Sequence, residues 1–113
     1  MEMTQAVQSL SALAQGSRLS IFRLLVAAGP AGMAAGSIGE KLDLPPATLS
    51  FHLAGLTRAG MAKSRQDGRF VIYSADFEGM GRLLAYLTED CCGGEACVPV
   101  PIQFVTPKQR KRA

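Results

Sequence analysis

The stretch PPATLSFHLAGLTRAGMAKSRQDGRFVIYS, residues 45–74, decides the fold, and its first half predicts a helix. Pro45 and Pro46 open this helix, because proline is tolerated in a first helical turn. Leucines then recur at the i, i+4 and i+7 spacing of a buried helical seam. They are Leu49, Leu53 and Leu56. Gly60 ends the pattern.

The second half of the stretch predicts a β-hairpin. Residues Met61–Arg65 and Arg69–Ser74 alternate between apolar and polar side chains, as half-buried strands do. Between them lies Gln66-Asp67-Gly68, and Asp-Gly is a strong signal for a tight turn. The whole stretch therefore predicts a helix followed by a two-stranded hairpin.

A shorter helix is predicted just before this stretch, over Ala35–Leu42, and Asp43-Leu44-Pro45 joins the two helices. Two short helices joined in this way and followed by a hairpin form a winged helix-turn-helix. Apolar residues at helical spacing predict three more helices. These are Met3–Ala14, Arg18–Ala28 and one that begins near Asp76 with Phe77, Met80, Leu84 and Leu87 on one stripe. The expected fold class is mainly α (α+β), with five helices and a two-stranded wing.

Length and composition fit one small domain. The chain has 113 residues, of which 48% are hydrophobic and 19% charged, values that are ordinary for a globular protein. A domain of this size buries a modest share of its surface, which favours support from a second subunit. We assign residues 1–97 to this domain and residues 98–113, which contain three prolines, to an extended basic tail.

Positive charge is concentrated in that tail. The net charge is +3, but four Lys and Arg residues lie in the last six positions. Without them, 8 Lys and Arg against 9 Asp and Glu leave a net charge of −1. The tail is therefore predicted to be a solvated arm or a nonspecific contact to phosphate.

The sequence gives no sign of a membrane or secreted protein. The longest stretch without charge, Leu24–Gly39, has 16 residues, fewer than the roughly 20 that a membrane-spanning helix needs. No apolar run follows a basic start, as it would in a secretory signal. We therefore expect a cytoplasmic protein without membrane contact.

The face of the 45–59 helix opposite its leucine seam is predicted to enter the major groove of DNA. Hydroxyl and imidazole groups can bond to phosphates or base edges, and a phenyl ring can touch a thymine methyl. Cations on the hairpin suit phosphate contact or the minor groove. The predicted DNA contacts are Ala47, Thr48, Ser50, Phe51, His52, Lys63, Arg65 and Arg69, with Gly55 on the same outer face. Each surface taken alone also fits an ordinary solvated face.

The cysteines lie within seven residues, at Cys91, Cys92 and Cys97. A structural disulfide is a poor explanation in a cytosolic protein, and adjacent residues are closer than the usual Cα separation of a disulfide. Three thiolates without a nearby histidine suit a soft, three-coordinate ion such as trivalent arsenic or antimony. Asp90 or Glu95 as a fourth ligand would allow zinc, cadmium or lead. Free or redox-active thiols are a further alternative.

Three segments strongly resemble the ArsR/SmtB family of winged helix-turn-helix repressors. They are ALAQGSRLSIFRLL at residues 12–25, ATLSFHLAGLTRAGMAKSRQDGRFVIYS at residues 47–74 and LLAYLTEDCCGG at residues 83–94. The most specific part is Ser50-Phe51-His52-Leu53 with Leu56, Gly60 and Gly68. Pro45-Pro46 departs from the Ser or other N-cap residue that relatives often have at this place.

The resemblance implies a homodimer through the first and last helices, which binds operator DNA with inverted half-sites and is released by an inducer. Some members hold metal through cysteines on the first helix of the DNA-binding pair, and others through His and Asp on the last helix. Met33–Leu42 has no cysteine and His52 is the only histidine, so neither site exists here. What remains resembles the arsenite-responsive members with cysteines after the last helix, or the related group that responds to methylated trivalent arsenicals with two cysteines.

We therefore expect a repressor and not an enzyme, with double-stranded operator DNA and a second copy of the chain as partners. No cofactor is obligatory, and the inducer is arsenite or antimonite. A reductase or thiol oxidoreductase would need Cys-x-x-Cys in a βαβ unit or a phosphate-binding glycine loop, and the sequence has neither. A repressor that responds to thiol oxidation and a winged-helix module that only dimerises stay open.

Overall fold

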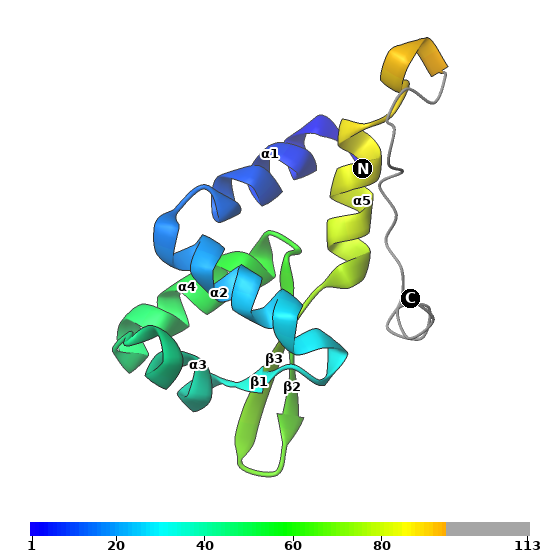
Figure 1. Ribbon diagram of the computed structural model, residues 1–113. Helices are drawn as coiled ribbons and strands as arrows, with labels where there is room; N and C mark the ends of the chain where they lie inside the picture. Colours follow the sequence, from blue (N-terminus) through cyan, green and yellow to red (C-terminus); the bar gives the residue numbers. More distant parts are fainter. Residues whose placement is uncertain (95–113) are drawn as a thin grey trace.

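The computed structural model describes residues 1–94, which form five α-helices beside a small antiparallel sheet (Figure 1). The helices are α1 (Met3–Leu13), α2 (Gly16–Ala28), α3 (Ala35–Leu42), α4 (Pro46–Arg58) and α5 (Phe77–Leu87). The strands are β1 (Met33–Ala34), β2 (Ala62–Asp67) and β3 (Phe70–Ala75). Single turns of 3₁₀ helix cover Gly29–Ala31 and Cys91–Gly94. This arrangement confirms the predicted winged helix-turn-helix, and the predicted tail, residues 98–113, lies outside the described range.

Helix α4 begins and ends where its prolines and glycine predict. Pro45 precedes the helix in extended conformation, and Pro46 occupies its first turn. The leucine seam is buried, since none of its three side chains is more than 4% exposed. Gly60 follows the helix with a φ of +78°, a left-handed conformation that glycine adopts without steric cost.

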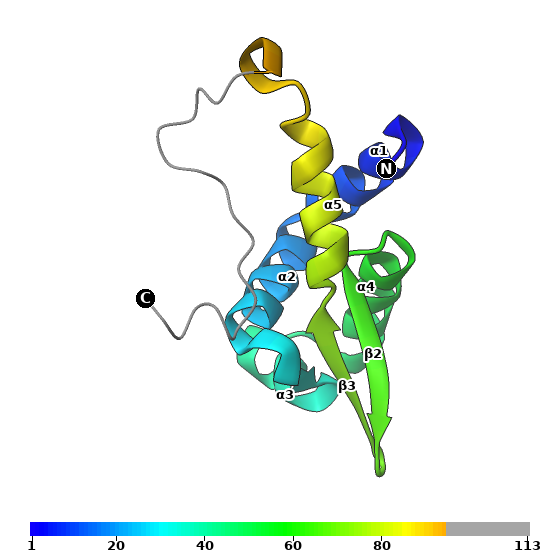
Figure 2. The ribbon, with the colours of Figure 1, turned by 90° about the vertical axis from the view of Figure 1, so that its right-hand side faces the viewer.

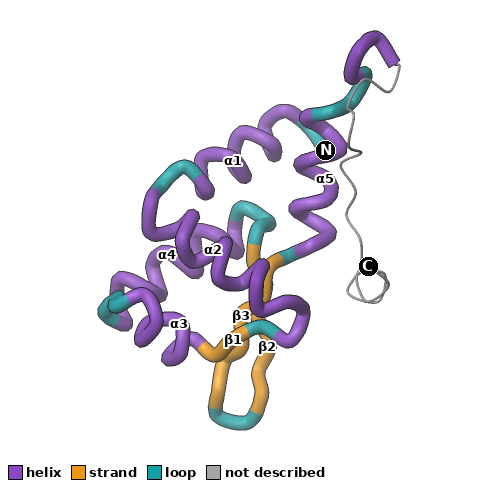
Figure 3. Tube along the Cα trace, viewed as in Figure 1, coloured by secondary structure: helices purple, strands orange, loops and turns teal. Residues whose placement is uncertain are grey.

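The hairpin has a shorter turn than predicted. Asp67 pairs with Phe70, so the connection consists of Gly68 and Arg69 rather than of residues 66–68. Gly68 has a φ of +63° and takes the first position of the turn, which leaves Asp67 in the strand. Figure 3 shows this hairpin projecting from the helical body as the wing.

Strand β1 adds a third strand that the sequence pattern did not indicate. Met33 pairs with Tyr73 and Ala34 with Ile72, so β3 lies in the middle of the sheet. Two residues are too few to show the alternation that is typical of a strand. The chain approaches β3 closely at Gly32, because a Cβ there would overlap the carbonyl oxygen of Tyr73.

The core lies where α2 and α4 pack against each other and against the sheet. Its largest fully buried apolar side chains are Ile21 and Leu25 of α2, Ile38 of α3, Leu53 and Leu56 of α4, and Met61. Helices α1 and α5 contact each other at the end of the molecule away from the wing (Figures 1 and 2). Among residues 1–94, no helix has the length and apolar character that crossing a membrane requires.

Candidate nucleic-acid interface

Four of the predicted DNA contacts form an exposed face on α4. Ala47, Thr48, Ser50 and Phe51 are all open to solvent, and Phe51 is 62% exposed. Neither the Thr48 nor the Ser50 hydroxyl makes a hydrogen bond to a described residue. Unbonded hydroxyls beside an exposed aromatic ring are groups that can bond base edges and contact a thymine methyl.

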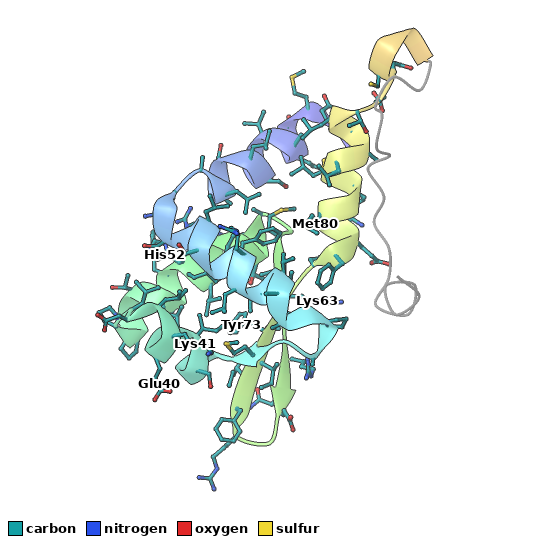
Figure 4. The ribbon with its side chains drawn as sticks, viewed as in Figure 1. Glu40, Lys41, His52, Lys63, Tyr73 and Met80 are labelled. Atoms are coloured by element: carbon teal, nitrogen blue, oxygen red, sulfur yellow. The ribbon has the colours of Figure 1, made fainter. Side chains whose placement is uncertain are left out.

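His52 does not belong to this face, so its predicted outward position was wrong. The residue is only 8% exposed and lies where α4 packs on α2 (Figure 4). Buried positions recur in α4 at 49, 52, 53 and 56, so the seam is wider than three leucines and includes the histidine. Gly55, also predicted outward, is buried as well. The imidazole is satisfied by Arg18, whose Nε donates to His52 Nδ1 at 3.2 Å.

Arg18 is the residue of this interface that sequence reasoning missed. It lies in the first turn of α2, yet its guanidinium carbon lies 5.4 Å from the centroid of the Phe51 ring on α4. Gly55 makes this approach possible, because a Cβ there would lie 3.0 Å from Arg18 Cζ. The available signal was Gly55 itself, since glycine inside a helix costs about 1 kcal/mol relative to alanine and indicates close approach.

A groove of about 600 Å³ runs between α1 and α4 beside this contact. It is lined by Val7, Gln8, Ser11 and Ala12 from α1, and by Arg18, Gly55, Arg58 and Ala59. Arg58, in the last turn of α4, makes no ion pair or hydrogen bond to a described residue. Arg18 and Arg58 therefore place two cations beside this groove.

The three wing cations are exposed and are spread along the hairpin. Arg69 is in the turn, whereas Lys63 pairs with Ser74 near the base of the wing (Figure 4). Arg65 donates through Nη2 to the carbonyl oxygen of Ala31 at 3.0 Å, which ties the wing to the turn after α2. Within residues 1–94, the side chains of Lys63 and Arg69 make no hydrogen bond or ion pair, so both can contact a DNA phosphate.

A second exposed surface, which we call the α1 strip, is apolar. It consists of Met3, Val7 and Leu10, spaced i, i+4 and i+7, with exposed fractions of 68, 53 and 42%. On the neighbouring α5, the predicted stripe is half-buried at Phe77, Met80 and Leu84 and 52% exposed at Leu87. A row of apolar side chains open to water on the two outer helices is typical of a protein–protein contact.

The cysteine segment lies beyond the end of α5, although the apolar stripe predicts that this helix runs into Cys91-Cys92-Gly93-Gly94. α5 stops at Leu87, and Asp90 has a φ of +58° before a single 3₁₀ turn that begins at Cys91. Cys91 is half-buried and does not continue the apolar stripe of α5. The Cys92 side chain and Cys97 lie outside the described part of the chain. Among the side chains that are described, no three His, Cys, Asp or Glu residues are grouped to hold a metal ion.

Comparison with known sequences agrees with this geometry. Residues 13–65 match a family described as a helix-turn-helix domain. The uncharacterized HTH-type transcriptional regulator YceK of Bacillus subtilis (strain 168) is 37% identical over 62 residues, which are 55% of this chain. The match spans 61% of the length of YceK.

Solved structures match most of the chain. HlyU from Vibrio cholerae N16961 is 32% identical, with a TM-score of 0.61 over 77% of this chain and 97% of that one. A possible transcriptional regulator for arsenical resistance is 28% identical, with a TM-score of 0.62. The match covers 71% of this chain and 80% of that protein. A third match is a homodimeric winged helix-turn-helix DNA-binding domain from Mycobacterium bovis, described as a possible ArsR-family regulator. It is 23% identical, with a TM-score of 0.64, and the match covers 85% of this chain and 89% of that domain. The chain therefore contains a helix-turn-helix domain and shares the winged helix-turn-helix fold of the Mycobacterium bovis domain.

Proposed function

We propose that the protein is a repressor that binds operator DNA as a homodimer and releases it when trivalent arsenic or antimony binds Cys91, Cys92 and Cys97. The observation that supports DNA binding most directly is the exposed face of α4, where unbonded hydroxyls flank an exposed aromatic ring. Arsenic as the inducer is supported by three cysteines within seven residues and by the relative described as a possible regulator for arsenical resistance.

In this proposal α4 lies in the major groove. Thr48 and Ser50 bond to base edges or nearby phosphates, and Phe51 contacts a thymine methyl. Arg69, at the tip of the wing, enters the minor groove or contacts the backbone. His52 no longer counts among the direct contacts, because its side chain is buried behind this face.

The α1 strip supports the homodimer. Its side chains remain 42–68% exposed in the described chain, and a second copy would bury them together with Leu87. The Mycobacterium bovis domain of the same fold is homodimeric. A two-fold dimer presents two α4 helices to successive half-sites, which lie about 34 Å apart in B-DNA.

Ser50→Ala and Arg69→Ala are expected to affect DNA binding differently. A base-edge contact acts only on the cognate sequence, so Ser50→Ala should weaken operator binding about tenfold and leave scrambled DNA unaffected. A phosphate contact acts on any sequence, so Arg69→Ala should weaken binding to operator and to scrambled DNA alike. It should also reduce the steepness of log K against log salt by about 1. Fluorescence anisotropy at several salt concentrations measures both effects.

Ser20→Ala is the matched control for these variants, because Ser20 is an exposed helical serine on α2 that lines neither the groove beside α4 nor the predicted contact face. It should leave affinity and salt slope unchanged. If the wild-type protein shows no salt-dependent binding to any DNA, the repressor proposal is wrong and a module that only dimerises is favoured.

The junction after α4 provides a route from the sensor segment to the DNA-contact helix. Ser9 of α1, 2% exposed, donates through Oγ to the carbonyl oxygen of Ala59 at 2.9 Å. Gly79 of α5 packs directly on the backbone of Gly60. Both outer helices thus hold the C-terminal end of α4, and a shift of α5 would move it. A coupling free energy of about 3 kcal/mol would weaken operator binding roughly a hundredfold.

Arsenite binding itself is expected to require the cysteine cluster. Titration of the reduced protein, followed by the ultraviolet absorbance of arsenic–sulfur bonds, should give about one arsenic per chain, since three thiolates complete a pyramidal centre. Cys91→Ser and Cys92→Ser should abolish the signal. Cys97→Ser should abolish arsenite binding but retain methylarsenite, which needs two thiolates.

Wild-type-like arsenite binding by all three single variants would overturn the cysteine site. Parallel titrations with zinc, cadmium and lead test whether an acidic fourth ligand directs the cluster to a divalent metal. A response to oxidant alone, with no response to arsenite under reducing conditions, would favour the thiol-oxidation alternative.

A further inference from the structure

We propose that Arg18 is a positioning residue that fixes the Phe51 ring and the outer face of α4 in the arrangement that contacts DNA. The inference rests on the proposed DNA binding. It concerns a residue of α2, outside the α3–α4 helix-turn-helix pair and outside the predicted contacts. Three neighbours on α4 support it, namely Phe51, His52 and Gly55.

The contact with His52 fixes one edge of the guanidinium. Arg18 Nε donates to His52 Nδ1 at 3.2 Å, and the imidazole is almost fully buried. A ring nitrogen that accepts a hydrogen bond carries no proton, so this contact requires the tautomer of His52 with its proton on Nε2. The histidine therefore acts as an internal anchor for Arg18 instead of facing DNA.

The contact with Phe51 fixes an exposed aromatic ring. Arg18 Cζ lies 5.4 Å from the Phe51 centroid, within the range of a cation–π interaction. Phe51 also meets His52 edge-to-face, with centroids 5.5 Å apart and ring planes at 63°. The three side chains form a closed cluster, and a ring held on two sides loses the alternative rotamers open to it at the surface.

The surroundings of Arg18 indicate that its side chain stabilises α4 rather than α2. Its backbone N–H donates to Gln15 Oε1 at 2.9 Å, which fixes the base of the side chain in the first turn of α2. A cation at this end of a helix is opposed by the helix dipole. Gly55 leaves the space that the guanidinium fills, because a Cβ there would lie 3.0 Å from Arg18 Cζ.

Arg18→Met tests the proposal, with Arg23→Met as the matched control on an exposed arginine of the same helix. Arg18→Met should weaken operator binding about tenfold, because Phe51 is no longer held, and should leave scrambled DNA and the salt slope unchanged. His52→Leu, which removes the acceptor, should cause a similar loss. The double variant should add little, as expected for residues that act through one cluster.

Two binding results would overturn the proposal. In one, Arg18→Met behaves like Arg23→Met. In the other, Arg18→Met weakens operator and scrambled DNA equally and lowers the salt slope by about 1, which would make Arg18 a phosphate contact.

A measurement on the wild-type protein keeps the test independent of variant folding. His52 is the only histidine, so its imidazole ¹⁵N signals are unambiguous. We expect Nε2 protonated and Nδ1 unprotonated and hydrogen-bonded, whereas a proton on Nδ1 would overturn the contact. If the wild type binds no DNA, the proposed function fails, and this spectrum still decides whether the cluster exists.

Discussion

Replacing Val7 by glutamate is expected to convert the proposed dimer to a monomer and to weaken operator binding by a factor of about 10²–10⁴. Val7 lies at the centre of the α1 strip, and dimerisation would bury its exposed side chain. An unpaired carboxylate there opposes association, because burying it leaves the charge uncompensated. A monomer binds only one half-site and therefore lacks the additional affinity that a dimer gains by binding two half-sites at once. Sedimentation velocity and anisotropy on the same samples measure the two effects.

Leu19→Glu is the matched control for this change. Leu19 is 45% exposed on α2 and lies outside the α1 strip, so a carboxylate there should alter neither assembly nor affinity. If the Val7→Glu protein remained dimeric, or if the wild type were monomeric at the concentrations that saturate DNA, dimerisation through α1 would be wrong.

Gly79→Ala is expected to lower the free energy of unfolding by about 3 kcal/mol, because overpacking a close contact forces the backbone to shift. A Cβ on Gly79 would overlap the carbonyl oxygen of Gly60, which follows α4, and would lie 3.3 Å from the Asp76 carboxyl carbon. Asp76 caps α5 through its bond to the Gly79 N–H at 2.9 Å, so the start of the helix has little freedom to move away. Urea unfolding followed by circular dichroism measures the loss.

Gly36→Ala separates this effect from the general response of a helix to alanine. Gly36 lies in α3 with nothing within 4 Å of its Cβ position, so alanine should be neutral or stabilise by up to about 1 kcal/mol. Equal stability of the Gly79→Ala and Gly36→Ala proteins would contradict the close packing of α5 on the end of α4.

The fold was predictable because its strongest signals are local. The seam of Leu49, Leu53 and Leu56 sets the phase of α4, and the glycines at 60 and 68 set the end of the helix and the turn of the wing. These residues act through backbone conformation and one buried face, both of which periodicity describes. Strand β1 was not predicted, because two residues are too few to show an alternation of apolar and polar side chains. Its position depends on pairing with β3.

The candidate site was less predictable, because side-chain contacts between helices leave no periodic trace. A polar imidazole at position 52 was assigned to the solvent face, whereas a partner 34 residues away satisfies it in the interior. Gly55 indicates a close approach to α4, but the sequence does not identify Arg18 as the partner, because Arg18 belongs to another helix. Thr48, Ser50 and Phe51 are exposed as expected, and their contact with DNA stays a prediction.

Release of DNA by arsenite tests the repressor account most directly. Reduced protein is bound to fluorescent DNA from upstream of its own gene, and arsenite is added while anisotropy is recorded. We predict release at micromolar arsenite in the wild type, and retained DNA binding without release in Cys91→Ser and Cys92→Ser. Tight binding by the reduced wild type that arsenite, antimonite and methylarsenite all leave unchanged would contradict the account.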